Sequence, residues 1–420
     1  MIRALRENWA LFAGMLMLMA ANGLLSTVLT IRGVAIGMSD TTIGLVHAGY
    51  PLGALLGSAY APKLVERVGH VRSFAALASL CSISAIVHLI TIDAWNWAAM
   101  RFLAGFCFPG LYVIAESWLN AKAENRSRAV VLSAYFVIQT AGASLGQALA
   151  GADDPGGTVL FVLTSILISL SLLPLMISRN PAPDYEAPDR MSVLRLARVS
   201  PVAMSGALFN GAVQAAFYIG VPLYGLALGL RPAEATLMLV VGTLSGAMAQ
   251  FPVGWLSDRT DRRFVIICLS AACIAVSLAL AVGLFQGSAY VAIALIGASI
   301  LPVYSICVAH ANDQIRPSQI VPASGTLVLT LNVGILFGAF AGPASIGFVG
   351  PGGLMWLFAM LSGLTGTIAL IRGLSAPAPG HMGTARPIAV QGTQTTGALY
   401  PEAEAAAEPD GPAGEHDVSR

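Results

Sequence analysis

Charged residues are scarce in this sequence. Aspartate, glutamate, lysine and arginine make up 10% of its 420 residues, whereas an ordinary soluble domain has about 25%. Lysine occurs only as Lys63 and Lys122. A water-soluble fold of this length could not cover its surface with so few charges, so the composition excludes an ordinary soluble protein. The formal net charge of +1 provides no basic surface stripe, and we therefore expect no nucleic-acid partner.

Cysteine pairs and catalytic motifs are also lacking. The five cysteines all lie in apolar runs without a CxxC pair, which excludes a zinc ribbon or a disulfide framework. No HExxH motif, Walker loop or dinucleotide fingerprint occurs, so we predict no metal ligands, no cofactor and no use of ATP. The segment 142–146 reads GASLG and matches the hydrolase pattern GxSxG, but it lies within an uncharged apolar run rather than at a strand-to-helix turn. We predict that the chain is not an enzyme.

Long apolar runs dominate what is present, and hydrophobic residues make up 56% of the chain. A helix needs about 20 residues to cross the hydrocarbon core of a membrane. Eight runs of that length carry no charge, apart from Arg101 in the fourth: 8–31, 41–62, 73–92, 94–115, 129–152, 155–178, 199–230 and 235–257. Two longer runs, 264–312 and 317–371, contain breakers at 285–288 and 350–353, and each is long enough for two crossings. Because the runs lack the alternation of barrel strands, the sequence predicts an all-α membrane protein with twelve transmembrane helices.

Lysine and arginine predict the orientation of these spans. With the N-terminus in the cytoplasm, 19 of the 22 basic residues fall on the cytoplasmic side. Arg32 and Arg231 fall outside, and Arg101 lies within a span. Basic residues are enriched in cytoplasmic loops, so we expect both termini to be cytoplasmic.

The chain repeats itself at an offset of 192 residues. Glycines at five positions recur in the same register, and Tyr112 and Asn120 recur as Tyr304 and Asn312. The glycine pairs are Gly14/Gly206, Gly37/Gly229, Gly105/Gly297, Gly142/Gly334 and Gly146/Gly338. Such a repeat predicts two pseudo-symmetric six-helix bundles related by an axis along the membrane normal. We expect the bundles at 1–178 and 201–372, a cytoplasmic linker at 179–200 with a short amphipathic helix, and a disordered tail at 373–420.

Two loops carry a recognisable pattern. The segment 254–263 reads GWLSDRTDRR, and 62–72 reads PKLVERVGHVR, a degenerate copy. The first resembles the G-x-L-x-D-R-x-G-R-R signature of the major facilitator superfamily, and the two copies follow the second and eighth spans. The resemblance covers residues 1 to about 372. It implies that superfamily's fold and alternating-access transport.

The charged residues of these loops are predicted to gate or couple transport. A carboxylate at a helix end can accept hydrogen bonds from a neighbouring helix N-terminus and pair with arginine, which would hold one face shut. In the alternative, the arginines only anchor helix ends at anionic headgroups. The predicted gating residues are Glu66, Arg67, Arg72, Asp258, Arg259 and Arg262.

Two further charges lie in or near the fourth span. Arg101 begins an R-x-x-x-G pattern that resembles the superfamily's fourth helix, and a charge at that depth should face a partner or a wet cavity. Snorkelling of Arg101 to the outer interface is the alternative. Glu116, nearer the cytoplasmic end, is predicted to pair with Arg67 or Arg128, and proton carriage is a second role considered for it.

In this fold the first, fourth, seventh and tenth spans line the path, helped by parts of the second, fifth, eighth and eleventh. Their polar and aromatic residues are mostly neutral amides, phenols and rings, which suits a neutral or weakly charged planar solute. For each residue a packing role is equally open. The predicted solute-binding residues are Asn22, His47, Tyr112, Tyr135, Gln139, Gln214, Tyr218, Tyr304 and Asn332.

We therefore predict a secondary-active or facilitative transporter of a small organic solute in a bacterial-type inner membrane, acting as a monomer within the lipid bilayer. Similarity to a branch near riboflavin transporters makes riboflavin uptake the specific candidate. Proton-coupled efflux of drugs or metabolites is the alternative within the class, and a membrane solute sensor is the alternative outside it.

Overall fold

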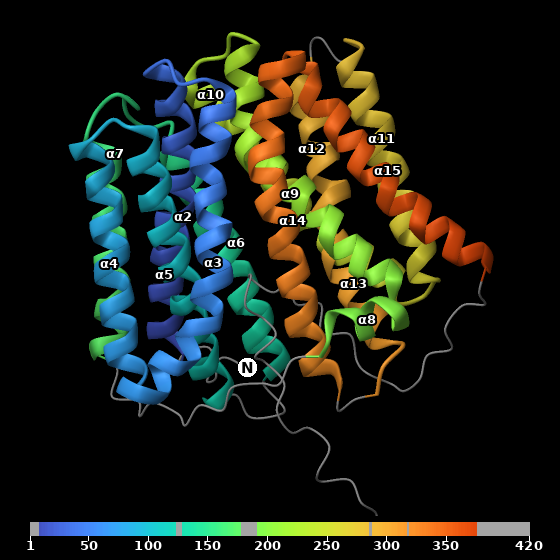
Figure 1. The fold of residues 1–420 in the computed structure, drawn as a ribbon, viewed down its shortest axis with the longest axis horizontal. Coiled ribbons are helices and arrows are strands. Elements are labelled where there is room, and N and C mark those ends of the chain that lie inside the picture. Colours follow the sequence, from blue (N-terminus) through green and yellow to red (C-terminus); the bar gives the residue numbers. More distant parts are fainter. Residues whose placement is uncertain (1–7, 123–127, 178–190, 285–287, 317–318, 376–420) are drawn as a thin grey trace, which may run out of the picture.

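The structure, a computed structural model, describes residues 8–122, 128–177, 191–284, 288–316 and 319–375, and these residues are almost entirely helical (Figure 1). The first part of the chain forms α2 (Trp9–Ala35), α3 (Asp40–Val68), α4 (His70–Ile90), α5 (Ala94–Lys122), α6 (Arg128–Leu149) and α7 (Val159–Ile177). The second part forms α9 (Pro201–Ala227), α10 (Pro232–Ser257), α11 (Arg262–Ala281), α12 (Ala289–Ile300), α13 (Val303–Asn312), α14 (Ile320–Val349) and α15 (Gly352–Ser375). The expected all-α fold is confirmed.

The long helices run side by side, the blue-to-teal helices of the first half next to the green-to-orange helices of the second (Figure 1). Eight helical segments of the described chain are long and apolar enough to cross a membrane, with α12 and α13 together forming one of them. The shorter apolar helix of Val159–Pro174 lies in α7. The predicted breaker at 350–353 coincides with the end of α14 and the start of α15. The arrangement is consistent with twelve crossings.

Close helix contacts recur in the two halves at the same offset as the sequence repeat. A side chain at Gly146 would overlap the backbone of Ala20, and one at Gly338, 192 residues later, would overlap the backbone of Ala212, which is likewise 192 residues after Ala20. The contacts of Gly142 with Leu16 and of Gly334 with Leu208 are related in the same way, as are those of Gly105 with Tyr50 and of Gly297 with Gly242. Small residues let helix backbones approach closely, so the repeated glycines produce the same packing twice.

The turn that ends the first helix of each half is also repeated. Gly37 and Gly229 have φ angles of 79° and 81°, a conformation that favours glycine. The next residue donates its backbone N–H back into the helix in both turns, from Met38 to Gly33 at 2.9 Å and from Leu230 to Gly225 at 3.1 Å. These are paired C-terminal helix stops of the Schellman type. We call the end of the molecule that carries them the glycine-turn end, and the opposite end, which carries α8 (Val193–Val199) and the 258–261 loop, the arginine end.

Each half has its own hydrophobic core. One buried cluster is built mainly from α2–α7, and two smaller clusters are built mainly from α8–α15. Ile43 of α3 is an exception, because it belongs to a cluster of the second half. Three glycines mark contacts between the halves: Gly44 against Phe340 and Gly151 against Ala233 are close approaches, and Gly347 makes an ordinary contact with Asp40. All three lie at the glycine-turn end, so this end is where the halves pack tightly together.

The described part of the linker is fixed to α14. The Met191 N–H donates to Pro322 O at 3.0 Å, and the Thr326 hydroxyl donates to Met191 O at 2.5 Å. Leu196 of α8 is fully buried in the second half's core. The chain just before α9 therefore moves with the second half. The rest of the predicted linker, 178–190, and the predicted tail from 376 onward lie outside the described residues.

Candidate functional site

Three polar residues of the first half are joined by hydrogen bonds. Asn22, partly exposed on α2, donates through Nδ2 to the Tyr112 hydroxyl at 3.0 Å and to the Tyr50 hydroxyl at 3.3 Å. Tyr112 comes from α5 and Tyr50 from α3, and both are buried. The ring of Phe108 lies 6.3 Å from that of Tyr50 and 6.0 Å from that of Tyr112. This cluster places one amide, two phenols and a phenyl ring at the meeting point of three helices.

Arg101 lies under the same cluster. Its guanidinium carbon is 4.6 Å from the centre of the Tyr50 ring, and the residue is only 3% exposed. Nε and Nη1 are buried without a hydrogen-bond partner among the described residues. Because the side chain lies inside the bundle, the structure does not favour the alternative in which Arg101 snorkels to the outer interface. A cation–π contact is worth about 2 kcal/mol when desolvated, so Tyr50 offsets only part of the cost of burying the charge.

Two histidines lie in the same half. His47 is 1% exposed, and its Nε2 is 2.9 Å from the Thr30 hydroxyl. His88 is fully buried, with its Nδ1 at 2.6 Å from Ser84 O and its ring packed edge-on to Trp97. Both belong to the bundle interior, as does Arg101. The first half thus buries several titratable groups around α3, α4 and α5.

The second half shows what the fold itself requires at these positions. The residues 192 positions after His47, Tyr50 and Arg101 are Leu239, Gly242 and Ile293. Leu239 and Ile293 are buried in a purely hydrophobic core. The same helix arrangement is therefore built with apolar residues in one half and polar residues in the other. The polar core of the first half is not needed to form the bundle, which makes it a candidate functional site.

Some predicted solute residues are related by the repeat. Gln214 of α9 is the counterpart of Asn22, and Tyr304 of α13 is the counterpart of Tyr112. Like Asn22, Gln214 is partly exposed, whereas Tyr304 is 3% exposed, as is Tyr112. Tyr218 lies one turn beyond Gln214 and is partly exposed, packed edge-on to Phe217. Each half therefore carries an amide on its first helix and a buried phenol on its fourth span.

The other predicted solute residues are buried on other helices. Tyr135 and Gln139 of α6 are 2% and 6% exposed, and Gln139 Nε2 has no partner among the described residues. Asn332 of α14 is 3% exposed and donates through Nδ2 to Val328 O at 2.9 Å. A packing role fits Asn332 well, because its amide already bonds its own helix.

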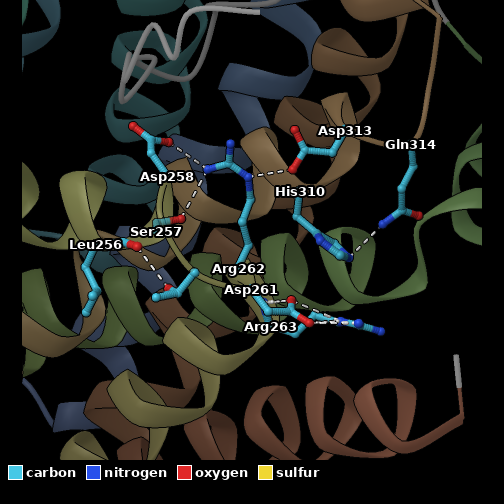
Figure 2. Close-up of polar contacts among 10 residues, drawn as sticks. Leu256, Ser257, Asp258, Asp261, Arg262, Arg263, His310, Asp313 and Gln314 are labelled. Carbon is cyan, nitrogen blue, oxygen red and sulfur yellow. Dashed lines mark hydrogen bonds and ion pairs between the residues drawn. The ribbon is translucent and has the colours of Figure 1, made fainter. Parts of the chain in front are cut away.

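A second polar cluster lies at the arginine end, where α10, α11 and α13 meet (Figure 2). Arg262 Nε bonds Asp313 Oδ2 at 2.6 Å, and its Nη1 bonds Asp258 Oδ1 at 3.1 Å. The same Nη1 donates to the Ser257 hydroxyl at 3.1 Å. The Arg262 side chain is 11% exposed. Arg262 therefore joins the ends of three helices within the second half.

Arg259 and Arg263 lie beside this cluster in different ways. Arg259 stacks over the Trp255 ring at 4.0 Å instead of pairing with Asp258. Arg263 pairs with Asp261 at 2.8 Å and donates to Arg372 O at 3.0 Å, which ties α11 to the end of α15. The hydrogen bond from the Arg263 side chain, helped by the Arg263 backbone N–H, lowers the pKa of Asp261 from its ordinary value.

Sequence reasoning found Asp258 and Arg262 but missed Asp313 and Asp261. Asp261 stands where the signature loop of the family has glycine, and that departure was the available signal. Glu66, Arg67 and Arg72 are exposed at the end of α3 and the start of α4. The side chains of Glu116 and Arg128 lie outside the described residues, so the predicted pairing of Glu116 is not observed.

These features define a polytopic membrane protein of two pseudo-symmetric helical bundles, the architecture of a secondary transporter. The family model of the Major Facilitator Superfamily matches residues 11–320. The chain belongs to this superfamily, as its loop motifs indicated, and is an MFS transporter of a membrane solute.

Similar proteins agree with this assignment. An uncharacterized MFS-type transporter, YcaD, from Salmonella arizonae is 28% identical over 333 residues, which cover 78% of this chain and 86% of that protein. YcaD from Salmonella newport is also 28% identical, over 338 residues, which cover 79% of this chain and 87% of that protein.

Solved structures share the fold. The nucleoside transporter NupG has a TM-score of 0.72 at 12% identity and covers 87% of this chain and 98% of its own. A D-xylose-proton symporter has a TM-score of 0.68 at 14% identity and covers 90% of this chain and 98% of its own. At such low identity these likenesses establish the fold alone.

Proposed function

We propose that this protein is a secondary-active or facilitative transporter that takes up a small, neutral, ring-containing solute by alternating access, with riboflavin as the specific candidate. The solute path runs between the halves at 1–178 and 201–372, which rock about the site. The protein is not an enzyme, and it acts as a monomer in the inner membrane with both termini in the cytoplasm.

One observation carries the proposal. The partly exposed amides Asn22 and Gln214 occupy equivalent positions on the first helix of each half, and Asn22 is held by two phenols. Amides can donate to and accept from the same solute edge, and nearby rings can stack on a planar molecule. Two related helices would thus present matching polar groups to a solute between them. Riboflavin has a flat ring system that both donates and accepts hydrogen bonds, which fits such a lining.

Growth of a riboflavin auxotroph on limiting vitamin tests this function. Expression of the chain should restore growth. Asn22→Leu or Gln214→Leu should reduce the rescue about tenfold or more, because each variant leaves a polar group of the bound solute without a hydrogen-bond partner. Asn96→Leu is the matched control, because Asn96 is likewise partly exposed, lies at the start of α5 and bonds the neighbouring Thr91 and Asp93. Absence of rescue by a chain confirmed in the membrane rules out riboflavin uptake.

Proton-coupled efflux is the second candidate, and the buried Arg101 and His47 of the first half favour it. Buried ionisable groups within membrane spans mark proton or ion pathways in many transporters. In vesicles loaded with solute, efflux should accelerate when a pH gradient is imposed, and Glu116→Gln should abolish that acceleration. Proton coupling is excluded if the pH gradient does not change the rate of efflux and Glu116→Gln has the same rate as the parent.

The cluster of Arg262, Asp258 and Asp313 supports a gating role at the arginine end. Because Arg262 bonds residues of α10 and α13 from the start of α11, it would make these helix ends move as one body when the halves rock. Glu66, Arg67, Arg72 and Glu116 would act as the corresponding group of the first half. Reporter fusions in the 258–261 loop and after Ser375 test the proposed orientation, and both should report a cytoplasmic location.

A further inference from the structure

A small cavity lies inside the second half. Helices α9, α11, α12, α13 and α15 all contribute to it, and its mostly apolar wall also carries hydroxyl and amide groups. The lining residues that carry polar atoms are Asn210, Ser270, Cys273, Ser299, Ser362 and Thr365. Its free space of about 10 Å³ is enough for one water molecule or one monatomic ion. It is too small for an organic solute and so is separate from the proposed transport path.

Three hydroxyls of the cavity already donate hydrogen bonds to other groups. Ser299 donates to Leu295 O at 2.7 Å, Thr365 donates to Leu361 O at 3.2 Å, and Ser362 donates to Cys273 Sγ at 3.2 Å. A hydroxyl that donates elsewhere still has oxygen lone pairs to offer. These three oxygens can therefore act only as acceptors or as ligands of a cation.

Asn210 adds an unsatisfied amide to the same wall. The residue is 4% exposed, and its Nδ2 has no hydrogen-bond partner among the described residues. A buried amide without a partner costs about 1–3 kcal/mol. A half-turn of the amide exchanges its nitrogen and oxygen, which are hard to distinguish, and presents Oδ1 to the cavity. With Oδ1 inward, Asn210 becomes a fourth neutral oxygen facing the same space.

The tenth span is kinked at this cavity, although Leu301 and Pro302 keep helical backbone angles. Helix α12 ends at Ile300 and α13 begins at Val303, and both of these residues line the cavity. Pro302 has no N–H, so the carbonyl of Ala298 loses its usual helical donor. The C-terminal end of a helix carries partial negative charge, which favours a cation. Discontinuous helices whose free carbonyls and C-terminal ends face a polar cavity coordinate coupling ions in other transporter folds.

The first half has no such wall. The residues 192 positions before Asn210, Ser270 and Ser299 are Leu18, Ala78 and Cys107, and all three are buried in the hydrophobic cluster of the first half. The corresponding helix, α5, is continuous from Ala94 to Lys122, although it contains Pro109. The bundle can thus be built without the cavity, its hydroxyls or the kink. These three features occur together only in the half that carries Asn210, within the part of the chain that the structure describes.

We propose that this cavity is a binding site for a monovalent metal cation, with sodium as the ion. The residues Asn210, Ser299, Ser362 and Thr365, which carry neutral oxygens, line a space large enough for one ion, and Pro302 frees the carbonyl of Ala298 next to Ser299. Hard oxygen ligands without carboxylates suit a singly charged ion, because a divalent ion in the bilayer core would lack compensating charge. The ion connects the amide of α9 to the hydroxyls of α12 and α15. Its use as a coupling ion rests on the proposed transport function, whereas its binding does not.

Thermal unfolding of the full chain in detergent, without solute, tests the site. The melting temperature should rise with NaCl along a saturating curve, because an ion that binds only the folded state stabilises it by mass action. Choline chloride at equal ionic strength should give no such rise. Asn210→Leu and the near-isosteric Thr365→Val should each weaken the apparent affinity for sodium about tenfold or more.

A matched control separates the site from the loss of any buried hydroxyl. Ser84 is fully buried in α4 and donates to Cys81 O at 2.7 Å, away from the cavity, so Ser84→Ala should keep the sodium response of the parent. Equal melting temperatures in sodium and choline overturn the proposal and leave a buried water as the occupant. An undiminished sodium response in folded Thr365→Val overturns it as well. Because no solute is present, neither result bears on riboflavin uptake.

Discussion

Arg101 is a buried charge in the first half, and the equivalent position of the second half carries no charge. The position 192 residues later holds Ile293, which is fully buried in an equivalent bundle. Nothing in the described residues pairs the Arg101 guanidinium with a carboxylate, and its main contact is the Tyr50 ring. A group that the fold does not require, and that costs free energy to bury, is expected to serve function.

The variant Arg101→Ile tests this directly. Replacing a buried charge by an apolar residue is often neutral or stabilising by about 1–4 kcal/mol, so the melting temperature should stay constant or rise. Transport activity should be lost in the same protein. His88→Leu, which copies Leu280 at the related position, serves as a second core replacement. A large fall in the melting temperature of Arg101→Ile would show instead that the arginine is structural.

Asp261 gives a pH dependence with a defined sign. Its pKa is lowered from 3.8 by the Arg263 side chain, so its contribution to stability is fully present above that pH and disappears as the pH falls through the lower folded value. We expect Asp261→Asn to lower the melting temperature at pH 7, because a hydrogen bond to a charged partner is worth about 1.5–3 kcal/mol. As the pH falls below 3.8 and through the lower folded value, the variant and the parent should converge. Parallel curves over this range would contradict the role of the carboxylate. Asparagine can also cap the N-terminus of α11, so the variant removes the charge of residue 261 and retains the helix cap.

Residue-level contacts were the hardest part to foresee from the sequence. Asp258 and Arg262 are four positions apart in one motif, so their pairing follows from local geometry. Asp313 is 51 residues from Arg262, and only the packing of α13 beside α11 brings the two together. The contact of His47 with Thr30 likewise needs the positions of two helices. A contact across one short loop is readable from the sequence, whereas the choice among neighbouring helices is not.

At the scale of helices, the sequence was far more informative. Uncharged runs predicted where the long helices lie, because a membrane span excludes charge over its whole length. The glycine register predicted which positions recur, and the structure shows the reason: the same helix pairs touch at the same glycines in both halves. The kink within the tenth span was not anticipated, although Pro302 was its signal.

Helix contacts at Gly146 and Gly338 should respond to the smallest substitution. An alanine Cβ at either position would overlap the backbone of the facing helix, which cannot move aside as a flexible side chain can. Overpacking of this kind costs about 1–3 kcal/mol, so Gly146→Ala and Gly338→Ala should each lower the melting temperature by a similar amount. Gly254→Ala is the control, because an added Cβ there meets no atom within 4 Å. Alanine is a better helix former than glycine, so the control should be neutral or slightly stabilised.

At the scale of the whole molecule, the contact between the halves is concentrated at the glycine-turn end. Gly44 faces Phe340, Gly151 faces Ala233, and Ile43 inserts into the core of the second half. The ion pairs of the described residues, by contrast, join residues within the second half. The structure therefore represents a state that is closed at the glycine-turn end by close backbone packing rather than by charge. In a rocking mechanism, opening this end requires these glycine contacts to separate.

The variant Gly44→Leu should shift the population toward the state that is open at the glycine-turn end. A Cβ at Gly44 would lie 2.9 Å from Phe340 O, so a leucine cannot be accommodated while the halves are closed, whereas the open state leaves it free. Each 1.4 kcal/mol of differential strain, roughly, changes the ratio of the two states tenfold. A cysteine introduced at Ile43, which is only 2% exposed and packs in the core of the second half, in a background without the five native cysteines, reports opening through its rate of labelling by a membrane-impermeant maleimide. Labelling should accelerate about tenfold or more in Gly44→Leu and much less in Gly347→Ala, where the added Cβ would lie 3.4 Å from Asp40 Cβ, an ordinary contact. Equal labelling rates in the two variants, with both proteins folded, would show that the tight packing at Gly44 does not control the closure of this end.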